Sequence, residues 1–198
     1  MIATLLSVSA CSYFRGAPPL TEKVELIAVM PIERQEPPRD DPGAQARLPP
    51  GAENVVTAQI YGVLSSSPEW RFVPDLTVSQ AMSKVPRTGS LEERARALGT
   101  AVGADAVLFG TVSRYVERVG REYGAREGAA VSFTLQLVWV ATGEILWRGS
   151  FDETQQPLSQ NLFNWWQFWR GGPRWFSAQE FTRLGVERVL DQLAARMD

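Results

Sequence analysis

The sequence contains no histidine and a single cysteine, Cys11. Without histidine there is no Ser-His-Asp or Cys-His catalytic arrangement and no histidine-ligated metal site. One cysteine forms neither an internal disulfide nor a thiolate zinc cluster. The chain also lacks the phosphate-binding pattern G-x-x-x-x-G-K-[ST] and a G-x-G-x-x-G fingerprint after a strand. These absences predict a protein that is not an enzyme and that binds no metal or cofactor.

Strong charge and long apolar runs are absent as well. The formal net charge of −2 provides no general attraction to nucleic acid or to anionic lipid. Beyond the amino terminus, no apolar run approaches the roughly 18 residues that a membrane-spanning helix needs. With 198 residues, 44% of them hydrophobic, the chain has the length and composition of one folded domain with tails.

The amino terminus indicates targeting to the cell envelope. Residues 1–10 are uncharged and mostly apolar or small, and they end directly before Cys11. The segment Leu6-Ser7-Val8-Ser9-Ala10-Cys11 resembles the lipobox of bacterial lipoproteins, which are cleaved before the cysteine and lipidated on it. Ser12 resembles the sorting residue for the outer membrane. We therefore expect a signal peptide over 1–10, a lipidated tether over 11–22, and anchoring at the periplasmic face of the outer membrane.

One feature departs from that pattern, because no Lys or Arg precedes Cys11. A signal peptide normally begins with a basic region, so we expect a signal that is cut short by a start placed downstream of the true one. The alternative is an apolar amino terminus with a buried structural thiol.

The first half of the chain predicts one strand and then mainly helices. Val24–Met30 is a short apolar run typical of a strand covered on both faces, and Pro31 marks its end. Residues 33–51 are rich in proline and charge and predict a mobile loop. The elements expected after this loop are a helix over 52–66, a short strand over 70–73, a helix over 77–85 capped by Thr77 or Asp75, and a helix after the capping residue Ser90.

The second half predicts a β-hairpin and a final helix. A strand is expected over 106–119, followed by a charged, glycine-rich turn over 120–128. Residues 130–140 alternate between apolar and polar side chains and pair in a hairpin with 145–151. Ser177 and Glu180 have the spacing of a capping box for a helix over 177–195. The order of elements predicts an α/β (α+β) domain over 23–198, with a single mixed sheet packed by helices and a C-terminal hairpin followed by a terminal helix.

An aromatic insertion over 161–176 separates the hairpin from the final helix. It contains four of the seven tryptophans and three of the nine phenylalanines. Clustered Trp with Arg is typical of membrane interfaces and of protein-binding hot spots. The alternative is a lid that folds back over the hairpin and the last helix. The residues that we expect to contact a partner or the membrane are Trp165, Trp166, Phe168, Trp169, Arg170, Trp175 and Phe176.

Three stretches together resemble a periplasmic superfamily: Leu26–Ile32, Gly103–Val112 and Thr142–Trp147. They are similar to its opening strand, its helix-to-strand junction and its hairpin turn with the return strand. The superfamily includes curli-secretion channel lipoproteins, lipoprotein activators of penicillin-binding proteins, and the amino-terminal domain of the propeller protein of the Tol–Pal system. The resemblance covers roughly 24–155 and 177–198.

This resemblance implies a non-enzymatic, lipid-anchored scaffold or assembly factor that binds an envelope protein. Two alternatives stay open. One is an oligomeric component of an outer-membrane secretion channel, which would make the chain a homo-oligomer. The other is a binder of cell-wall glycan that uses stacked tryptophans.

Overall fold

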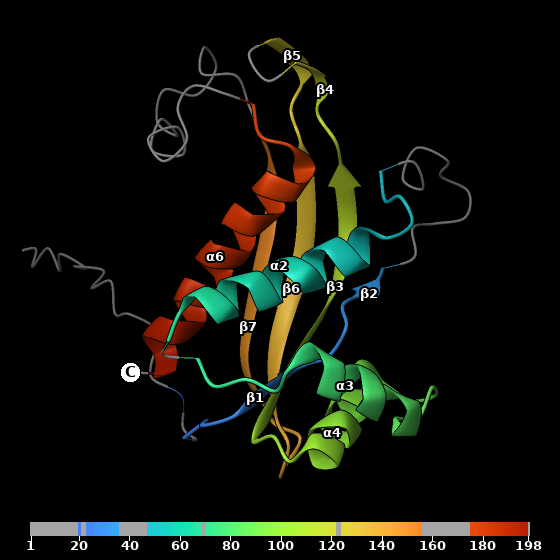
Figure 1. Ribbon diagram of the computed structural model, residues 1–198, viewed down its shortest axis with the longest axis vertical. Coiled ribbons are helices and arrows are strands. Elements are labelled where there is room, and N and C mark those ends of the chain that lie inside the picture. The colour runs from blue at the N-terminus through green and yellow to red at the C-terminus, as the bar shows by residue number, and fades with distance from the viewer. Residues whose placement is uncertain are drawn as a thin grey trace, which may run out of the picture.

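The computed structural model describes residues 20, 23–35, 47–68, 70–121, 124–155 and 175–197. In these residues a mixed sheet lies between two unequal groups of helices (Figure 1). Cys11 and the aromatic residues 165–170 lie outside the described part of the chain.

The main sheet has five strands in the order β1-β3-β6-β7, with β2 also pairing with β3. β1 and β2 run parallel to β3, whereas β3, β6 and β7 are antiparallel neighbours. This sheet, followed by the terminal helix, confirms the predicted fold class. The strands are β1 (Ile27–Val29), β2 (Glu33–Arg34), β3 (Ala106–Val116), β6 (Ala130–Trp139) and β7 (Ile145–Thr154).

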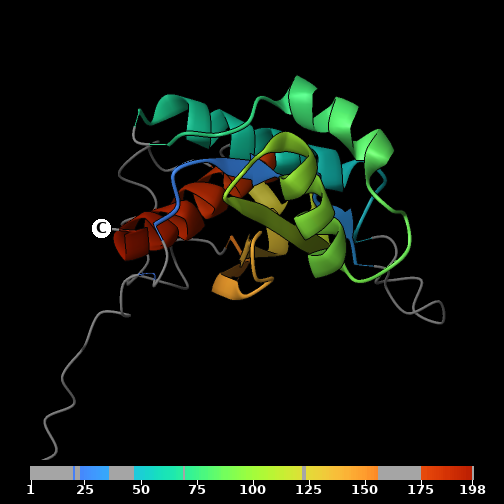
Figure 2. The same ribbon diagram turned by 90° about the horizontal axis from the view of Figure 1, so that it is seen from below.

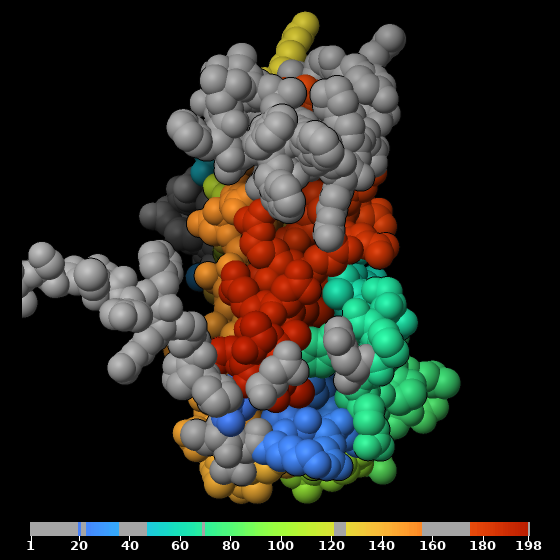
Figure 3. Space-filling model, turned by 90° about the vertical axis from the view of Figure 1, so that its left-hand side faces the viewer, coloured from blue at the N-terminus to red at the C-terminus, as the bar shows by residue number. Residues whose placement is uncertain are grey.

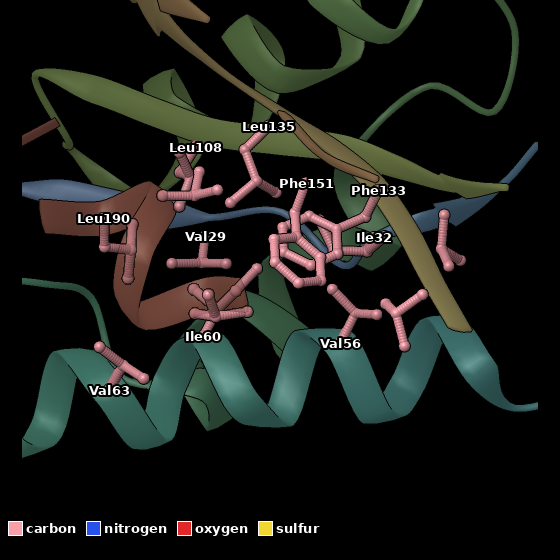
Figure 4. Close-up of a cluster of buried hydrophobic side chains, with 14 of the residues drawn as sticks. Val29, Ile32, Val56, Ile60, Val63, Leu108, Phe133, Leu135, Phe151 and Leu190 are labelled. Carbon is pink, nitrogen blue, oxygen red and sulfur yellow. The ribbon is translucent and has the colours of Figure 1, made fainter. Parts of the chain in front are cut away.

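Helices α2 (Ala52–Ser66) and α6 (Ala178–Met197) cover one face of the sheet. The bounds of α2 confirm the helix predicted over 52–66, and its predicted apolar stripe is buried. Figure 4 shows Val56, Ile60 and Val63 pointing from α2 toward the strands. Deeper in this core, the rings of Phe133, Phe151 and Phe181 pack in sequence, with centroids 5.6 and 5.3 Å apart.

Helices α3 (Asp75–Ala81) and α4 (Leu91–Val102) pack on the other face of the sheet. Successive residues of a strand point to opposite faces, so Ala28 and Val107 belong to this second core while their neighbours belong to the first. Ser90 and Glu93 form a capping box on α4, which confirms the predicted start of that helix. Figure 1 shows α3 and α4 gathered at the end of the molecule that faces the viewer in Figure 2.

The cap predicted for α3 is wrong. Neither Thr77 nor Asp75 caps it, because both lie inside the helix and Pro74 occupies the capping position without a side-chain hydrogen bond. The following residues form a 3₁₀ turn (Met82–Lys84) in place of a continued α-helix. The strand predicted over 70–73 is reduced to one bridge between Phe72 and Ile27.

The charged turn predicted over 120–128 is also wrong, since it contains a two-stranded ribbon. β4 (Val119–Arg121) and β5 (Gly124–Glu127) pair antiparallel and extend the β3–β6 hairpin beyond the sheet (Figure 1). Their sequence carries no apolar alternation, and none of the ribbon side chains that the structure describes joins a core.

The interval 33–51 takes part in the fold at both ends that the structure describes. Glu33 and Arg34 pair with Thr111 and Val112 of β3. At the other end Leu48 is 1% exposed and belongs to the core beneath α2. A single leucine among prolines and charges gives no periodic signal, which is why the sequence pattern missed it.

Candidate partner-binding surface

The ribbon presents an exposed surface at one end of the molecule. Val119 is 49% exposed and, with Leu76, is one of two large hydrophobic residues exposed to this degree among the described residues. Arg126 and Glu127 on the returning strand are exposed as well. We call Val119, Arg126, Glu127 and Trp175 the ribbon-end surface. It combines apolar, cationic and anionic side chains on and beside the ribbon, which projects from the body of the protein (Figure 1).

Gln155 joins the two described stretches that flank 156–174, at the base of the ribbon. Gln155 is 5% exposed. Its backbone N–H donates to the Ala129 carbonyl at 2.8 Å, and its Oε1 accepts from the Phe176 N–H at 2.9 Å. The residues on either side of 156–174 are therefore hydrogen-bonded neighbours. Sequence reasoning missed Gln155, because its partners lie more than twenty residues away along the chain.

Two of the predicted contact residues, Trp175 and Phe176, are described by the structure. Phe176 is 6% exposed and belongs to the core beneath α6. Trp175 is half-buried; its ring packs on Gly128, where a Cβ atom would lie 2.8 Å from Trp175 Cζ3. The carbonyl of Trp175 accepts a hydrogen bond from the Arg118 guanidinium. The other predicted residues, Trp165, Trp166, Phe168, Trp169, Arg170 and the lipidation site Cys11, lie outside the described residues.

Helix α6 begins at the same end of the molecule. Its first turn is capped by Ser177 and Glu180, as predicted from their spacing. Both carboxylate oxygens of Glu117 also accept from the Ala178 N–H at 3.1 Å. An anion at a helix amino terminus is favoured by the helix dipole, so Glu117 ties the base of the ribbon to α6.

The amino-terminal tether meets the domain at the opposite end of α6. The N–H of Leu20 donates to the Arg196 carbonyl at 2.6 Å, in the last turn of the helix. A helix of 20 residues is about 30 Å long. The ribbon-end surface and the start of the tether are therefore separated by about the length of α6, as Figure 1 shows.

Two tyrosines of the core and its border have shifted pKa values. Burial, assisted by Asp75, raises the pKa of Tyr61, whose hydroxyl donates to the Val29 carbonyl at 3.2 Å. Burial and then Glu117 raise the pKa of Tyr115. Both hydroxyls therefore stay neutral well above pH 7. Within the described residues there is no cluster of three or more potential metal ligands, and no helix has the length and hydropathy to cross a membrane.

The family model described as "Peptidoglycan-synthase activator LpoB" matches residues 53–152, just over half of the chain. No curated protein sequence matches this chain. The chain is similar in structure to the PelC dodecamer from Paraburkholderia phytofirmans, at 16% identity, with 89% of this chain and 92% of that chain covered and a TM-score of 0.50.

Two further solved structures are similar to the chain at lower TM-scores. The LpoB C-terminal domain from Salmonella enterica is 19% identical, with 68% of this chain and 87% of that chain covered and a TM-score of 0.42. Lipoprotein GNA1162 from Neisseria meningitidis is 21% identical, with coverage of 88% and 99% and a TM-score of 0.45. At these identities, what the chain shares with PelC is the fold.

Proposed function

The chain belongs to the peptidoglycan-synthase activator family LpoB, and from this premise we propose that it is a non-enzymatic activator of a peptidoglycan synthase. In this proposal, lipid on Cys11 anchors it to the periplasmic face of the outer membrane and the ribbon-end surface contacts the synthase. The family match over 53–152 is the observation that carries the proposal. It agrees with the absence of histidine and with the resemblance of the strand and turn motifs to envelope lipoproteins.

The two ends of α6 support the choice of surface. Residues 11–19 span at most about 30 Å when fully extended, and they start from Leu20 at the carboxyl end of the helix. The ribbon lies at the amino end of the helix. With α6 directed away from the membrane, the ribbon-end surface and the two ends of the aromatic insertion face the periplasm, where a synthase domain can bind them.

The exposed side chains fit a protein partner. Val119 and the half-buried Trp175 provide apolar area, and Arg126 beside Glu127 provides charges of both signs at short range. Aromatic and arginine side chains are enriched in binding hot spots. We include Trp165, Trp166, Phe168, Trp169 and Arg170 in the proposed contact region, because Gln155 and Phe176, which lie on either side of 156–174, are hydrogen-bonded at the base of the ribbon. Phe176 itself is buried in the core and is not part of this region.

The test is synthase activity in the presence of the lipidated protein. The bifunctional peptidoglycan synthases of the native host are purified one by one, and glycan polymerisation from lipid II is measured with and without equimolar lipoprotein. We expect one of them to polymerise several times faster and to co-purify with the lipoprotein. If none is stimulated or bound, the proposed function is wrong.

Two matched variants locate the surface. Val119→Lys removes the exposed apolar group and places a cation opposite Glu127, which the ribbon tolerates. We expect the affinity for the synthase to fall about tenfold, the effect of roughly 1.4 kcal/mol. Leu76→Lys changes the other exposed hydrophobic residue, on α3 at the far end, and should leave the affinity unchanged. Equal losses in both variants would place the contact elsewhere.

Replacing Trp165, Trp166 and Trp169 together by Ala distinguishes the roles of the insertion. A loss of synthase binding with unchanged membrane association supports a partner contact. Release from membranes without loss of synthase binding supports a bilayer contact instead. The native mass in detergent shows whether the protein forms a channel oligomer. Titration with peptidoglycan fragments, followed by tryptophan fluorescence, shows whether it binds glycan.

A further inference from the structure

Strand β7 forms a free edge of the sheet in the described part of the chain. It pairs with β6 on one side, and no other described strand pairs with it. On the surface it runs beside α6 (Figure 3). An edge strand presents a row of unpaired backbone N–H and C=O groups, and an extended chain can pair with them. β7 is ten residues long, enough to pair with a peptide of that length.

A depression of about 430 Å³ lies over the paired middles of β6 and β7, next to this edge. Gly149 of β7, which has no side chain, is one of its lining residues. A Cβ on Gly149 would lie 2.4 Å from the ring of Trp147, so the buried tryptophan requires glycine at this position. The residues that line the depression are Thr134, Leu135, Gln136, Arg148, Gly149, Ser150 and Gln192.

The charge of the depression comes from Arg148, which is exposed. Its neighbours are neutralised: Arg114 pairs with Asp152, and Arg188 pairs with Glu153. No carboxylate of the described residues pairs with Arg148, which leaves a guanidinium with five N–H donors beside the free edge.

The polar side chains around Arg148 match an acidic ligand. Thr134 and Ser150 contribute hydroxyl groups, and Gln136 and Gln192 contribute amides. The Gln136 Oε1 is buried without a hydrogen-bond partner, so this amide is not committed to another contact in the fold. A carboxylate can receive a two-point hydrogen bond from Arg148 and further bonds from these groups.

These two features select the same ligand chemistry. Free backbone groups favour an extended peptide, and the unpaired guanidinium favours a carboxylate on that peptide. We propose that the β7 edge binds an extended acidic segment of a partner protein, which adds as a strand next to β7 and places an Asp or Glu side chain on Arg148. This site lies along the sheet edge, apart from the ribbon-end surface, and it goes beyond the proposed activation of a synthase.

The test uses the whole protein and three blocked ten-residue peptides. The first alternates Thr and Val with one central Glu, the second has Gln in place of Glu, and the third is the Glu peptide with N-methyl groups on alternate amides. Affinity is measured by fluorescence anisotropy, and the site is mapped by backbone amide chemical shifts. We expect the Glu peptide to shift the amides of 145–154. The Gln peptide should bind about tenfold more weakly, since a charge-assisted bond contributes about this factor. The N-methylated peptide should bind as weakly or worse, because it lacks the N–H groups that pair with an edge strand.

Arg148→Ala should weaken the Glu peptide to the level of the Gln peptide. The matched control Arg87→Ala, an exposed arginine in the turn before α4, should leave binding unchanged. The proposal is overturned if the N-methylated peptide binds equally well, if the chemical shifts change outside β7, or if Arg148→Ala has no effect. So does binding of peptidoglycan fragments in place of the peptides, or a dimer that Arg148→Ala dissolves. Synthase stimulation is measured separately, so the two proposals fail independently.

Discussion

At the scale of single residues, two glycines within helices predict opposite responses to the same change. A Cβ on Gly185 would lie 2.7 Å from the ring of Phe151, which is held between Phe133 and Phe181. Nothing lies within 4 Å of a Cβ on Gly62, which is exposed in α2. We expect Gly62→Ala to stabilise the protein by about 0.5–1 kcal/mol. Gly185→Ala should destabilise it by about 1–3 kcal/mol, since overpacking exceeds the helix gain.

Urea denaturation of the two variants checks this difference. The free energy of unfolding should rise for Gly62→Ala and fall for Gly185→Ala, with similar m-values for both. If both variants are stabilised, the aromatic cluster has room for a methyl group and the packing described for α6 is wrong.

Residues whose role depends on distant partners were the least accessible from sequence. Asp105 lies directly before β3. Its carboxylate also accepts from the N–H groups of Glu25 and Leu26, 80 and 79 positions away, and so holds the chain that leads into β1. Gln155, at the base of the ribbon, likewise forms hydrogen bonds with residues more than twenty positions away along the chain. No local pattern announces such contacts, because the fold brings the partners together.

At the scale of elements, sequence periodicity identified the parts that pack on a core. Buried faces account for the apolar stripe of α2 and the alternation of β6. Local hydrogen bonds account for the capping boxes of α4 and α6. The β4–β5 ribbon was missed because its sequence has no alternation of apolar and polar residues, the signal by which a strand on a core is predicted. The aromatic density of 161–176 was visible in the sequence, whereas its composition does not specify what it contacts.

This difference between elements predicts a difference in local stability. No residue of β4 or β5 whose side chain the structure describes belongs to either core, whereas β3 and β6 lie at the centre of the sheet. In native-state hydrogen exchange we expect the amides of the ribbon to open with free energies near 0 and those of β3 and β6 to approach the global value. Slow exchange throughout the ribbon would contradict this prediction and would indicate a contact that covers it.

At the scale of the whole molecule, the placement of tether and ribbon at opposite ends of α6 predicts how the anchored protein stands on a bilayer. If Cys11 carries lipid, as we propose, the protein has no free thiol, and a cysteine introduced at Glu127 or Lys23 can be labelled alone. In nanodiscs with quencher lipids, we expect fluorescence from position 23, next to the tether, to be quenched more than that from position 127, about 30 Å further along α6. The orientation is wrong if position 127 is quenched as strongly.

The anchor itself is checked in the native host. Wild-type protein should incorporate labelled fatty acid and fractionate with outer membranes, and Cys11→Ala should appear unlabelled in the soluble periplasmic fraction. Membrane association of Cys11→Ala would assign the attachment to another part of the chain.

The parallel pairing of β1 with β3 has a mechanical consequence. β1 follows the tether and β3 leads into the ribbon, and the two strands point the same way, with Ile27 opposite Ala106 and Val29 opposite Leu108. Tension between a stationary membrane and a moving synthase would slide these strands past each other lengthwise. Their hydrogen bonds, with that of the Met30 N–H to the Leu108 carbonyl at 2.9 Å, would then stretch together and not one after another. Such a shear arrangement would let a short strand withstand force if, as we propose, the protein links the membrane to a synthase.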